Sequence, residues 1–270
     1  MSDRLIRIGV QLHPQQADYA QIREAVIRAE DMGVDVLFNW DHFYPLYGDE
    51  DGKHFECWTM LAAWAEQTSR VEIGALVTCN SYRNPNLLAD MARTVDHISD
   101  GRLILGIGSG WAERDYIEYG YPFGTAGSRL DDLGEALPVI EARWEQLNPA
   151  PTRKIPVLIG GGGEKKTLKF VARHADIWHT FVQGDDLAHK IDVLRGHCAS
   201  EGRDLADIEI SVGVGGRGRE GRLPDAPEVE GRPLHDLGAR LFTLGIGGPD
   251  YDLSVAEPWI AWRDALNAVS

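Results

Sequence analysis

The residues best suited to chemistry follow two apolar runs in the first half of the chain. The run VDVLFNW leads into Asp41 and His42, and the next apolar run leads into Thr78 and Asn80. A histidine beside a carboxylate can exchange a proton near neutral pH. Threonine and asparagine side chains can hydrogen-bond the edge of a heterocyclic ring or a ribityl chain. The same residues also suit loop capping and turn formation, so their types alone leave both roles open.

A glycine-rich turn follows another apolar run at GIGSGW. It contains Gly108, Ser109, Gly110 and Trp111, and it lacks the completed GxGxxG spacing of a dinucleotide-binding fold. Glycines at this place let a flat ligand lie close to the backbone. We therefore expect these residues to line a ligand pocket.

A second glycine-rich turn, GGGGEKKT, leads directly into an amphipathic helix. Gly161, Gly162 and Gly163 expose backbone N–H groups at the start of that helix, with Lys165 and Thr167 close behind. Free N–H groups and the positive end of a helix dipole both favour an anion. The turn predicts a phosphate site, with an ordinary solvated loop as the alternative.

Metal catalysis is not indicated by the histidine pattern. His54 and Glu56 stand close in sequence, but no HExxH motif occurs and no HxH follows the first apolar run. His13 follows that run and could line the same site, although a lone histidine is more often structural. His174 and His179 flank a later apolar run, and core packing explains them better.

Composition indicates an ordinary globular protein. The chain has 270 residues, 43% of them hydrophobic and 26% charged, so we expect one domain over residues 1–270. A formal charge of −15 disfavours a nucleic acid or an anionic membrane as partner. Three cysteines without CxxC spacing argue against a disulfide framework. The first ten residues resemble a strand rather than a signal peptide, so a cytoplasmic protein is expected.

Apolar, β-branched runs alternate with amphipathic helices along the chain. The strands are expected at 5–11, 34–40, 71–77, 102–107, 155–160, 176–181, 207–213 and 241–246. This order predicts a (β/α)₈ TIM barrel, with a doubly wound open sheet as the alternative. Helices are expected at 19–32, 128–147 (bent at Pro138), 185–201 and 253–268, and 109–127 and 214–236 as loops, the latter mobile.

Three motifs together resemble the bacterial luciferase-like superfamily, and within it the deazaflavin-dependent oxidoreductases. They are WDHFYP, LVTCNSYRNPNLLADMARTVDHISDGRLILGIGSGW and LIGGGGEKKTLKFVARHADIW. The resemblance covers about residues 5–200. It implies a TIM barrel that holds coenzyme F420, an 8-hydroxy-5-deazaflavin, in a pocket at the carboxyl ends of the strands.

The resemblance also implies roles for single residues. Asp41 matches a coenzyme-bonding aspartate, His42 an active-site histidine and Thr78 a coenzyme-bonding threonine. Ala75-Leu76 falls where relatives have a non-prolyl cis peptide, and the triple-glycine turn falls where they receive the coenzyme phosphate. Together with the turn residues above, the expected coenzyme contacts are Asp41, Ala75, Leu76, Thr78, Asn80, Gly108, Ser109, Gly110, Trp111, Gly161, Gly162, Gly163 and Thr167.

The sequence departs from one branch of this family at two positions. Relatives that oxidise glucose 6-phosphate carry a glutamate where Ser109 stands and a tryptophan where Leu46 stands. These differences disfavour a sugar-phosphate dehydrogenase. Other members lack that glutamate and pair the motif with a GW turn followed by glutamate, as in Gly110-Trp111 and Glu113 here.

The expected function is hydride transfer between C5 of coenzyme F420 and a small organic substrate, with His42 exchanging the proton. Trp40, Phe43, Tyr44 and Trp111 are expected to form a dry aromatic pocket. The alternatives are an FMN-dependent luciferase-like monooxygenase, a non-catalytic F420- or flavin-binding protein and, more distantly, a metal-dependent hydrolase. The resemblance favours a homodimer, and loops that the sequence does not shape would choose the substrate.

Overall fold

The computed structural model describes residues 4–215 and 226–269 of the chain, and its strands lie close to their predicted positions. They are β1 Arg7–Leu12, β2 Val36–Asn39, β3 Glu72–Ala75, β4 Thr78–Cys79, β5 Leu103–Gly108, β6 Val157–Gly160, β7 Ile177–Thr180, β8 Glu209–Val214 and β9 Ala239–Ile246. The predicted strand 71–77 is interrupted, and its continuation pairs separately as β4.

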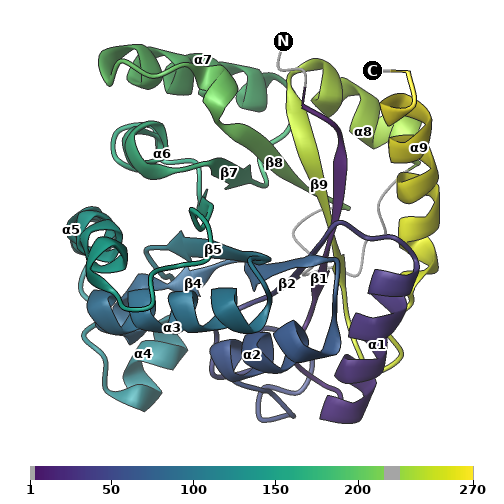
Figure 1. Cartoon of the computed structure of the whole chain (residues 1–270), viewed down its shortest axis with the longest axis horizontal. Helices are drawn as coiled ribbons and strands as arrows, with labels where there is room; N and C mark the ends of the chain where they lie inside the picture. Colours follow the sequence, from purple (N-terminus) through teal and green to yellow (C-terminus); the bar gives the residue numbers. More distant parts are fainter. Residues whose placement is uncertain (1–3, 216–225, 270) are drawn as a thin grey trace.

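These strands form a closed parallel barrel. Neighbours pair in the order β3-β2-β1-β9-β8-β7-β6-β5-β4, and an additional β3–β5 pairing completes the ring. Because β4 continues β3, the ring has eight strand positions within the described residues. Figure 1 shows the helices arranged around it, with β1 and β9 side by side. The predicted (β/α)₈ TIM barrel is confirmed, and the open-sheet alternative is excluded.

Three of the four helices predicted with bounds lie within two residues of those bounds, and the fourth, predicted at 253–268, begins later, at Glu257. The helices around the barrel are α1 Tyr19–Asp31, α2 Cys57–Gln67, α3 Pro85–Ile98, α4 Glu113–Tyr119, α5 Ala126–Gln146, α6 Thr167–His174, α7 Gly184–Ser200, α8 Pro227–Asp236 and α9 Glu257–Asn267. Short 3₁₀ turns are η1 Asn80–Tyr82, η2 Leu205–Asp207 and η3 Leu253–Ala256.

Two predicted loops contain helices. The loop prediction for 214–236 is wrong at 227–236, where α8 begins with Pro227 in its first turn and carries Pro233 inside it. Residues 216–225 of that segment lie outside the described residues. The loop prediction for 109–127 is wrong at α4, which ends at Gly120 in a left-handed conformation with φ of 71°. Both helices are short, so their periodicity is weak in the sequence.

Side chains that point alternately to the two faces of each strand form two apolar layers, one outside the barrel and one inside it. Ile8, Val10 and Leu12 pack outward against the helices, as part of the main core. Inside the barrel, a second cluster contains Val36, Phe38, Leu76, Ile104, Leu158, Ile177 and Leu241. Because side chains on a strand point alternately to its two faces, the barrel interior is filled and the ligand space is confined to its ends.

Local signals explain where individual helices begin. Asn84 caps α3 by accepting a hydrogen bond from the N–H of Asn86 at 2.9 Å, and Pro85 takes the first helical position, as predicted. Glu56 caps α2, accepting from the N–H groups of Trp58 and Thr59. The Glu56 cap matters for the site, because Glu56 also contacts Arg83.

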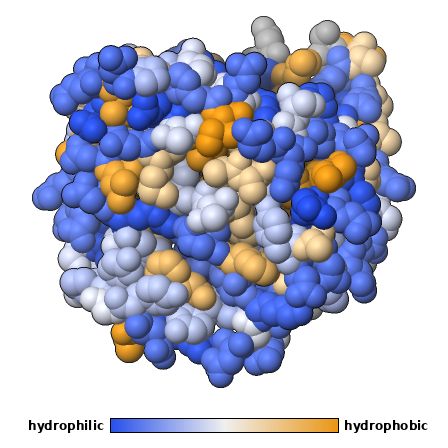
Figure 2. Space-filling model, turned by 60° about the horizontal axis from the view of Figure 1, so that its bottom comes forward, coloured by the Kyte–Doolittle hydropathy of each residue, from blue (hydrophilic) through white to orange (hydrophobic). Residues whose placement is uncertain are grey.

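Much of the face shown in Figure 2 is hydrophilic. In Figure 2, the apolar residues of the face shown lie in small groups among polar ones and do not form one continuous patch. Among the described residues, no helix is both long and apolar enough to span a membrane.

Candidate active site at the carboxyl ends of the strands

A cavity of about 370 Å³ opens where β2 to β7 end. That volume is at the lower end of the range for small-molecule sites, about 300–1,000 Å³. Its walls come from segments far apart in sequence: Asp41, His42, Leu76, Val77, Cys79, Tyr82, Gly108, Ser109, Gly110, Trp111, Gly160, Gly161, Gly162, His179, Thr180, Phe181 and Val182. The structure thus brings together the DHF segment and both glycine turns.

The glycines let this part of the barrel close tightly around Val77. A side-chain Cβ at Gly108 would lie 2.8 Å from Val77 Cγ2, and one at Gly160 would lie 2.9 Å from Val77 Cγ1. Gly161 has a φ of 127°, which side-chain-bearing residues rarely adopt. The result is a wall without side chains at Gly108 and Gly160–Gly162, against which a planar ring can lie.

The non-prolyl cis peptide lies one residue later than predicted. It joins Leu76 to Val77, not Ala75 to Leu76. Ala75 ends β3 and does not line the cavity, whereas Leu76 and Val77 do. The Leu76 carbonyl accepts a hydrogen bond of 2.7 Å from the Gln11 side chain, so β1 holds this part of the wall in place.

His42 is held by a buried carboxylate that the sequence prediction missed. Asp115 lies on α4, and its Oδ2 is 2.7 Å from His42 Nδ1. Its Oδ1 accepts a hydrogen bond from the Phe43 N–H at 3.2 Å. Tyr82 donates its hydroxyl to the same carboxylate at 3.0 Å. Burial alone would raise the pKa of Asp115, but these three hydrogen bonds and the His42 charge outweigh it and lower the pKa.

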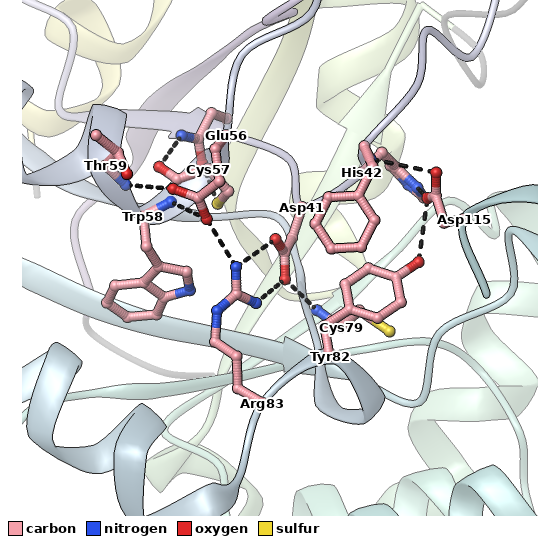
Figure 3. Close-up of polar contacts among 12 residues, drawn as sticks. Asp41, His42, Glu56, Cys57, Trp58, Thr59, Cys79, Tyr82, Arg83 and Asp115 are labelled. Carbon is pink, nitrogen blue, oxygen red and sulfur yellow. Dashed lines mark hydrogen bonds and ion pairs between the residues drawn. The ribbon is translucent and has the colours of Figure 1, made fainter. Parts of the chain in front are cut away.

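Asp41 is engaged by protein groups on both carboxylate oxygens. Arg83 contacts Asp41 at 2.5 and 2.9 Å and also contacts Glu56 at 2.8 Å (Figure 3). The N–H of Cys79 donates to Asp41 Oδ2 at 2.9 Å. Asp41 therefore links the end of β2 to β4 through Cys79, and to Arg83, which follows η1. Arg83 in turn contacts Glu56 at the start of α2. Asp41 still lines the cavity, but its charge is already compensated.

Loss of Arg83 should destabilise the protein. Asp41 is 1% exposed, so Arg83→Met leaves a buried carboxylate without its cation, and removing one partner of a buried pair costs about 3–5 kcal/mol. Urea denaturation of the variant measures the change in free energy of unfolding. The control is Arg195→Met, because Arg195 pairs with Asp192 on the surface and such pairs contribute about 1 kcal/mol or less. Equal effects in both variants would contradict the structural role given to Arg83.

Several predicted coenzyme contacts lie near the cavity without lining it. Thr78 is fully buried, and its hydroxyl has no hydrogen-bond partner among the described residues. Asn80 lies in η1 and is 8% exposed. Gly163 ends the glycine turn and Thr167 begins α6, and a Cβ at Gly163 would lie 2.9 Å from Thr167 Oγ1. Their coenzyme roles stay predictions.

The glycine turn after β6 is anchored to β7. Gly161 donates its N–H to the His179 carbonyl at 3.0 Å, and its carbonyl accepts from the Trp178 indole at 2.7 Å. That N–H is thus not available to an anion, unlike the N–H groups of Gly162 and Gly163, which have no protein acceptor among the described residues. Lys190 of α7 donates a hydrogen bond of 2.8 Å to the Gly162 carbonyl.

The predicted aromatic pocket is mostly wrong. Of its four residues, Trp111 alone lines the cavity, and its ring lies edge-on to His42 at 5.5 Å. Trp40 stacks on His13 with ring centres 4.5 Å apart, and Phe43 stacks on Tyr119 at 3.9 Å. Phe43 is thus covered by α4, and Trp40 by His13 at the end of β1, so neither ring faces the cavity.

The buried His13 and His179 and the partly buried His54 stay neutral at physiological pH. Burial lowers the pKa of His13 to about 3 and that of His179 to about 3. Burial and then the charge of His42 lower the pKa of His54 to about 4. His179 is hydrogen-bonded to Ser211 at 2.8 Å and also lines the cavity, so its assignment to core packing was incomplete.

These histidines predict a pH dependence of stability. Below pH about 6.5 the unfolded chain binds protons on His13 and His179 that the folded chain does not, so stability falls with decreasing pH. The fall is up to about 1.4 kcal/mol per pH unit for each group. Urea denaturation between pH 7.5 and 5 measures it, and His179→Gln should make the slope shallower. An unchanged free energy of unfolding over that range would refute the prediction.

The functional residues missed by sequence reasoning have weak local signals. Asp115 lies in ERD, two residues after the expected Glu113, which is exposed at the start of α4. Arg83 and Tyr82 stand in the polar turn after β4, where their types suggested only a loop. Only helical phasing of α4 could have singled out Asp115. The described residues contain no group of three or more His, Cys, Asp or Glu side chains that could hold a metal ion.

Comparison with known proteins identifies the family of the chain. The sequence model of the family described as luciferase-like monooxygenase matches residues 4–215. The chain belongs to this family. An uncharacterized protein of Mycobacterium tuberculosis is 28% identical over 225 residues, which cover 75% of this chain and 73% of the relative. An F420-dependent glucose-6-phosphate dehydrogenase of Amycolatopsis mediterranei is 29% identical over 189 residues, covering 64% of this chain and 56% of the relative.

Solved structures of similar fold include enzymes of both cofactor types. An F420-dependent secondary alcohol dehydrogenase, in complex with an F420-acetone adduct, superposes with a TM-score of 0.83 at 20% identity over 99% of this chain and 100% of its own. The oxygenating constituent of 3,6-diketocamphane monooxygenase from Pseudomonas putida, in complex with FMN, superposes with a TM-score of 0.63 at 18% identity over 77% and 67%. At these identities the likeness establishes the barrel alone.

Proposed function

We propose that this luciferase-like protein is an oxidoreductase that transfers a hydride between coenzyme F420 and a small organic substrate. The observation that carries the proposal is the His42–Asp115–Tyr82 arrangement at a cavity with glycine walls. A histidine held through Nδ1 by a buried carboxylate presents Nε2 as its remaining proton-exchanging atom. The glycine walls suit a planar ring beside it.

The residues present fit the coenzyme in two respects. Leu76 and Val77, with the side-chain-free wall at Gly108 and Gly160, would hold the flat ring. The N–H groups of Gly162 and Gly163 would receive the phosphate. When bound, the coenzyme supplies a carbon that carries or accepts the hydride. The chain supplies orientation, a proton at His42 and partial exclusion of water by Trp111.

Asp115 orients the His42 ring through its contact with Nδ1. When His42 takes up a proton on Nε2, the adjacent carboxylate stabilises the imidazolium that forms. Phe43 and Tyr82 fix the carboxylate through their own hydrogen bonds, so the ring cannot turn away freely.

The relatives support F420 over other cofactors. Glucose-6-phosphate dehydrogenases named as F420-dependent match the sequence, and an F420-dependent alcohol dehydrogenase covers the whole fold. The FMN complex of the diketocamphane monooxygenase keeps an FMN-dependent monooxygenase as the second candidate. A non-catalytic coenzyme-binding protein is the third. A cytoplasmic location and a homodimer stay predictions.

Oxygen sensitivity separates these functions. The protein is mixed anaerobically with reduced F420 or reduced FMN, and the absorbance spectrum is followed after air is admitted. We expect the reduced F420 complex to persist in air and to be reoxidised only when an electrophilic substrate from a panel is added. Rapid reoxidation of bound FMN with product oxygenation would instead indicate a monooxygenase. Binding of F420 without reaction with any electrophile would indicate a non-catalytic protein.

A further inference from the structure

We infer that Lys190 of α7 is a positioning residue for an anion at the glycine turn after β6, although it does not itself contact the anion. By bonding the Gly162 carbonyl, it fixes the direction of the Gly163 N–H. The inference rests on the proposed function, in which this turn receives the coenzyme phosphate. Figure 1 shows α7 beside α6, the helix that follows the turn.

The backbone acceptors of the turn are occupied, whereas two of its donors are free. Side chains and one N–H group from β7, α6 and α7 bond the carbonyls of residues 161–164. These donors are, in order, the Trp178 indole at 2.7 Å, Lys190 Nζ at 2.8 Å, the Leu168 N–H at 2.9 Å and His197 Nε2 at 2.8 Å. The N–H groups of Gly162 and Gly163 have no acceptor among the described residues. Successive free N–H groups of this kind favour an anion.

The peptide planes of the turn place the two free N–H groups opposite the bonded carbonyls. The peptide bonds 161–162 and 162–163 are trans, so the N–H of each points away from its C=O. The Gly161 carbonyl is bonded by Trp178, which packs in the core outside the barrel, and the Gly162 carbonyl by Lys190. Both N–H groups therefore point away from that core and from α7. Lys190 lies on the wrong side of the peptide to bond the same anion.

A turn made of glycines needs such restraints. Glycine adopts many backbone conformations at similar cost, and Gly161 has a φ of 127° here. Fixing the backbone before a ligand arrives removes that entropic cost from binding. Lys190 also packs its stem on the turn, because a Cβ at Gly162 would lie 3.4 Å from both Cδ and Cε of Lys190. Nζ and the stem together hold the Gly162–Gly163 peptide in one orientation.

The charge of Lys190 acts through this peptide. A cation at a carbonyl oxygen polarises the amide, which makes its N–H a stronger donor. Lys190 Nζ also lies 3.1 Å from Glu164 Oε1, and the Lys190 side chain is only 18% exposed. The carboxylate thus keeps Nζ beside the turn and offsets its charge at longer range. We therefore expect Lys190 to act by orienting and polarising the Gly163 N–H, not by attracting the anion from a distance.

The test compares ligands with and without a phosphate. FO is F420 without the phosphodiester and the tail attached to it, so both contain the same ring and ribityl chain. Fluorescence titrations measure both dissociation constants for the wild-type protein and for Lys190→Met. We expect Lys190→Met to weaken F420 about 5- to 50-fold and FO by less than about twofold, because F420 alone carries an anion for the turn. Unchanged F420 affinity, or an equal loss for both ligands, overturns the inference.

Further variants separate positioning from loss of charge and from loss of fold. Lys169→Met removes one exposed cation from α6 that bonds none of the four carbonyls, so F420 affinity should stay within about twofold. Lys190→Arg keeps a cationic donor and should restore part of the affinity. Trp178→Phe removes the donor to Gly161 and should again weaken F420 more than FO. Urea denaturation checks that each variant is folded. Equal losses in Lys169→Met and Lys190→Met, or no restoration by arginine, contradict the positioning role.

The salt dependence of binding distinguishes positioning from direct contact. A lysine that pairs with the phosphate contributes to the weakening of F420 binding by salt, because salt screens such a pair. We expect F420 binding to Lys190→Met to weaken with added salt as steeply as binding to the wild-type protein. A clearly shallower dependence would show that Lys190 contacts the anion itself and would contradict its assignment as a positioning residue.

Failure of the inference and failure of the proposed function give different results. Wild-type protein that binds FO as tightly as F420 would contradict the inference and leave the coenzyme assignment standing. Preference for FMN would contradict the proposed function. The same variants are then titrated with FMN and riboflavin, which differ only in the phosphate, and a loss confined to FMN supports the inference. Binding of none of these four ligands contradicts both.

Discussion

His42→Ala should lower the turnover number about 10²- to 10⁴-fold while leaving the affinity for F420 within several-fold. The loss is that of one positioned general acid or base. His42 lines the cavity but is held from behind by Asp115, so its removal takes away the proton and little of the glycine wall that would hold the coenzyme. Steady-state kinetics and a separate fluorescence titration of F420 measure the two quantities.

A matched variant shows whether the effect belongs to this histidine. His97 lies on α3 and bonds the Ala150 carbonyl, away from the cavity, so His97→Ala should leave both quantities unchanged. The proton role of His42 would be wrong if His42→Ala weakened F420 binding strongly while turnover at saturation stayed the same.

Asp115→Asn should also lower turnover about 10²- to 10⁴-fold, although Asp115 does not line the cavity. An amide in place of the carboxylate can donate to His42 Nδ1, which reverses the hydrogen bond and no longer stabilises a charged ring. The Tyr82 hydroxyl loses a charged acceptor at the same time. We expect the turnover number to fall more than the Michaelis constant rises, which stopped-flow and steady-state rates measure.

The conservative replacement distinguishes positioning from folding. Asp115→Glu keeps the charge and should restore part of the lost turnover, whereas a purely structural role predicts that both variants lose activity only in proportion to their loss of folded protein. Circular dichroism and thermal unfolding of both variants provide that comparison. Full activity in Asp115→Asn would contradict the role of Asp115 in positioning His42.

The barrel could be predicted because its signals repeat. Buried parallel strands read as apolar runs, and each of the eight predicted runs coincides with a strand to within a few residues. Short helices were missed for the opposite reason. α4 has 7 residues and α8 has 10, and their own sequences, with glycine and proline close by, show little periodicity.

The site was predicted in its location and less well in its contacts. That Asp41 and His42 end a strand places them at the carboxyl end of a barrel. The bidentate pairing of Asp41 with Arg83 depends on how η1 turns back toward β2, and the bond from Asp115 to His42 depends on how α4 folds over the DHF segment. Both are set by tertiary packing, which residue types and spacing do not contain.

The central claim is that this barrel holds coenzyme F420, and a fluorescence titration tests it most directly. The purified protein is titrated with F420 and, separately, with FMN at one moderate salt concentration. We expect a dissociation constant for F420 in the micromolar range or below and much weaker binding of FMN. The reverse preference would contradict the claim and favour a flavin monooxygenase, and binding of neither would contradict the coenzyme assignment altogether.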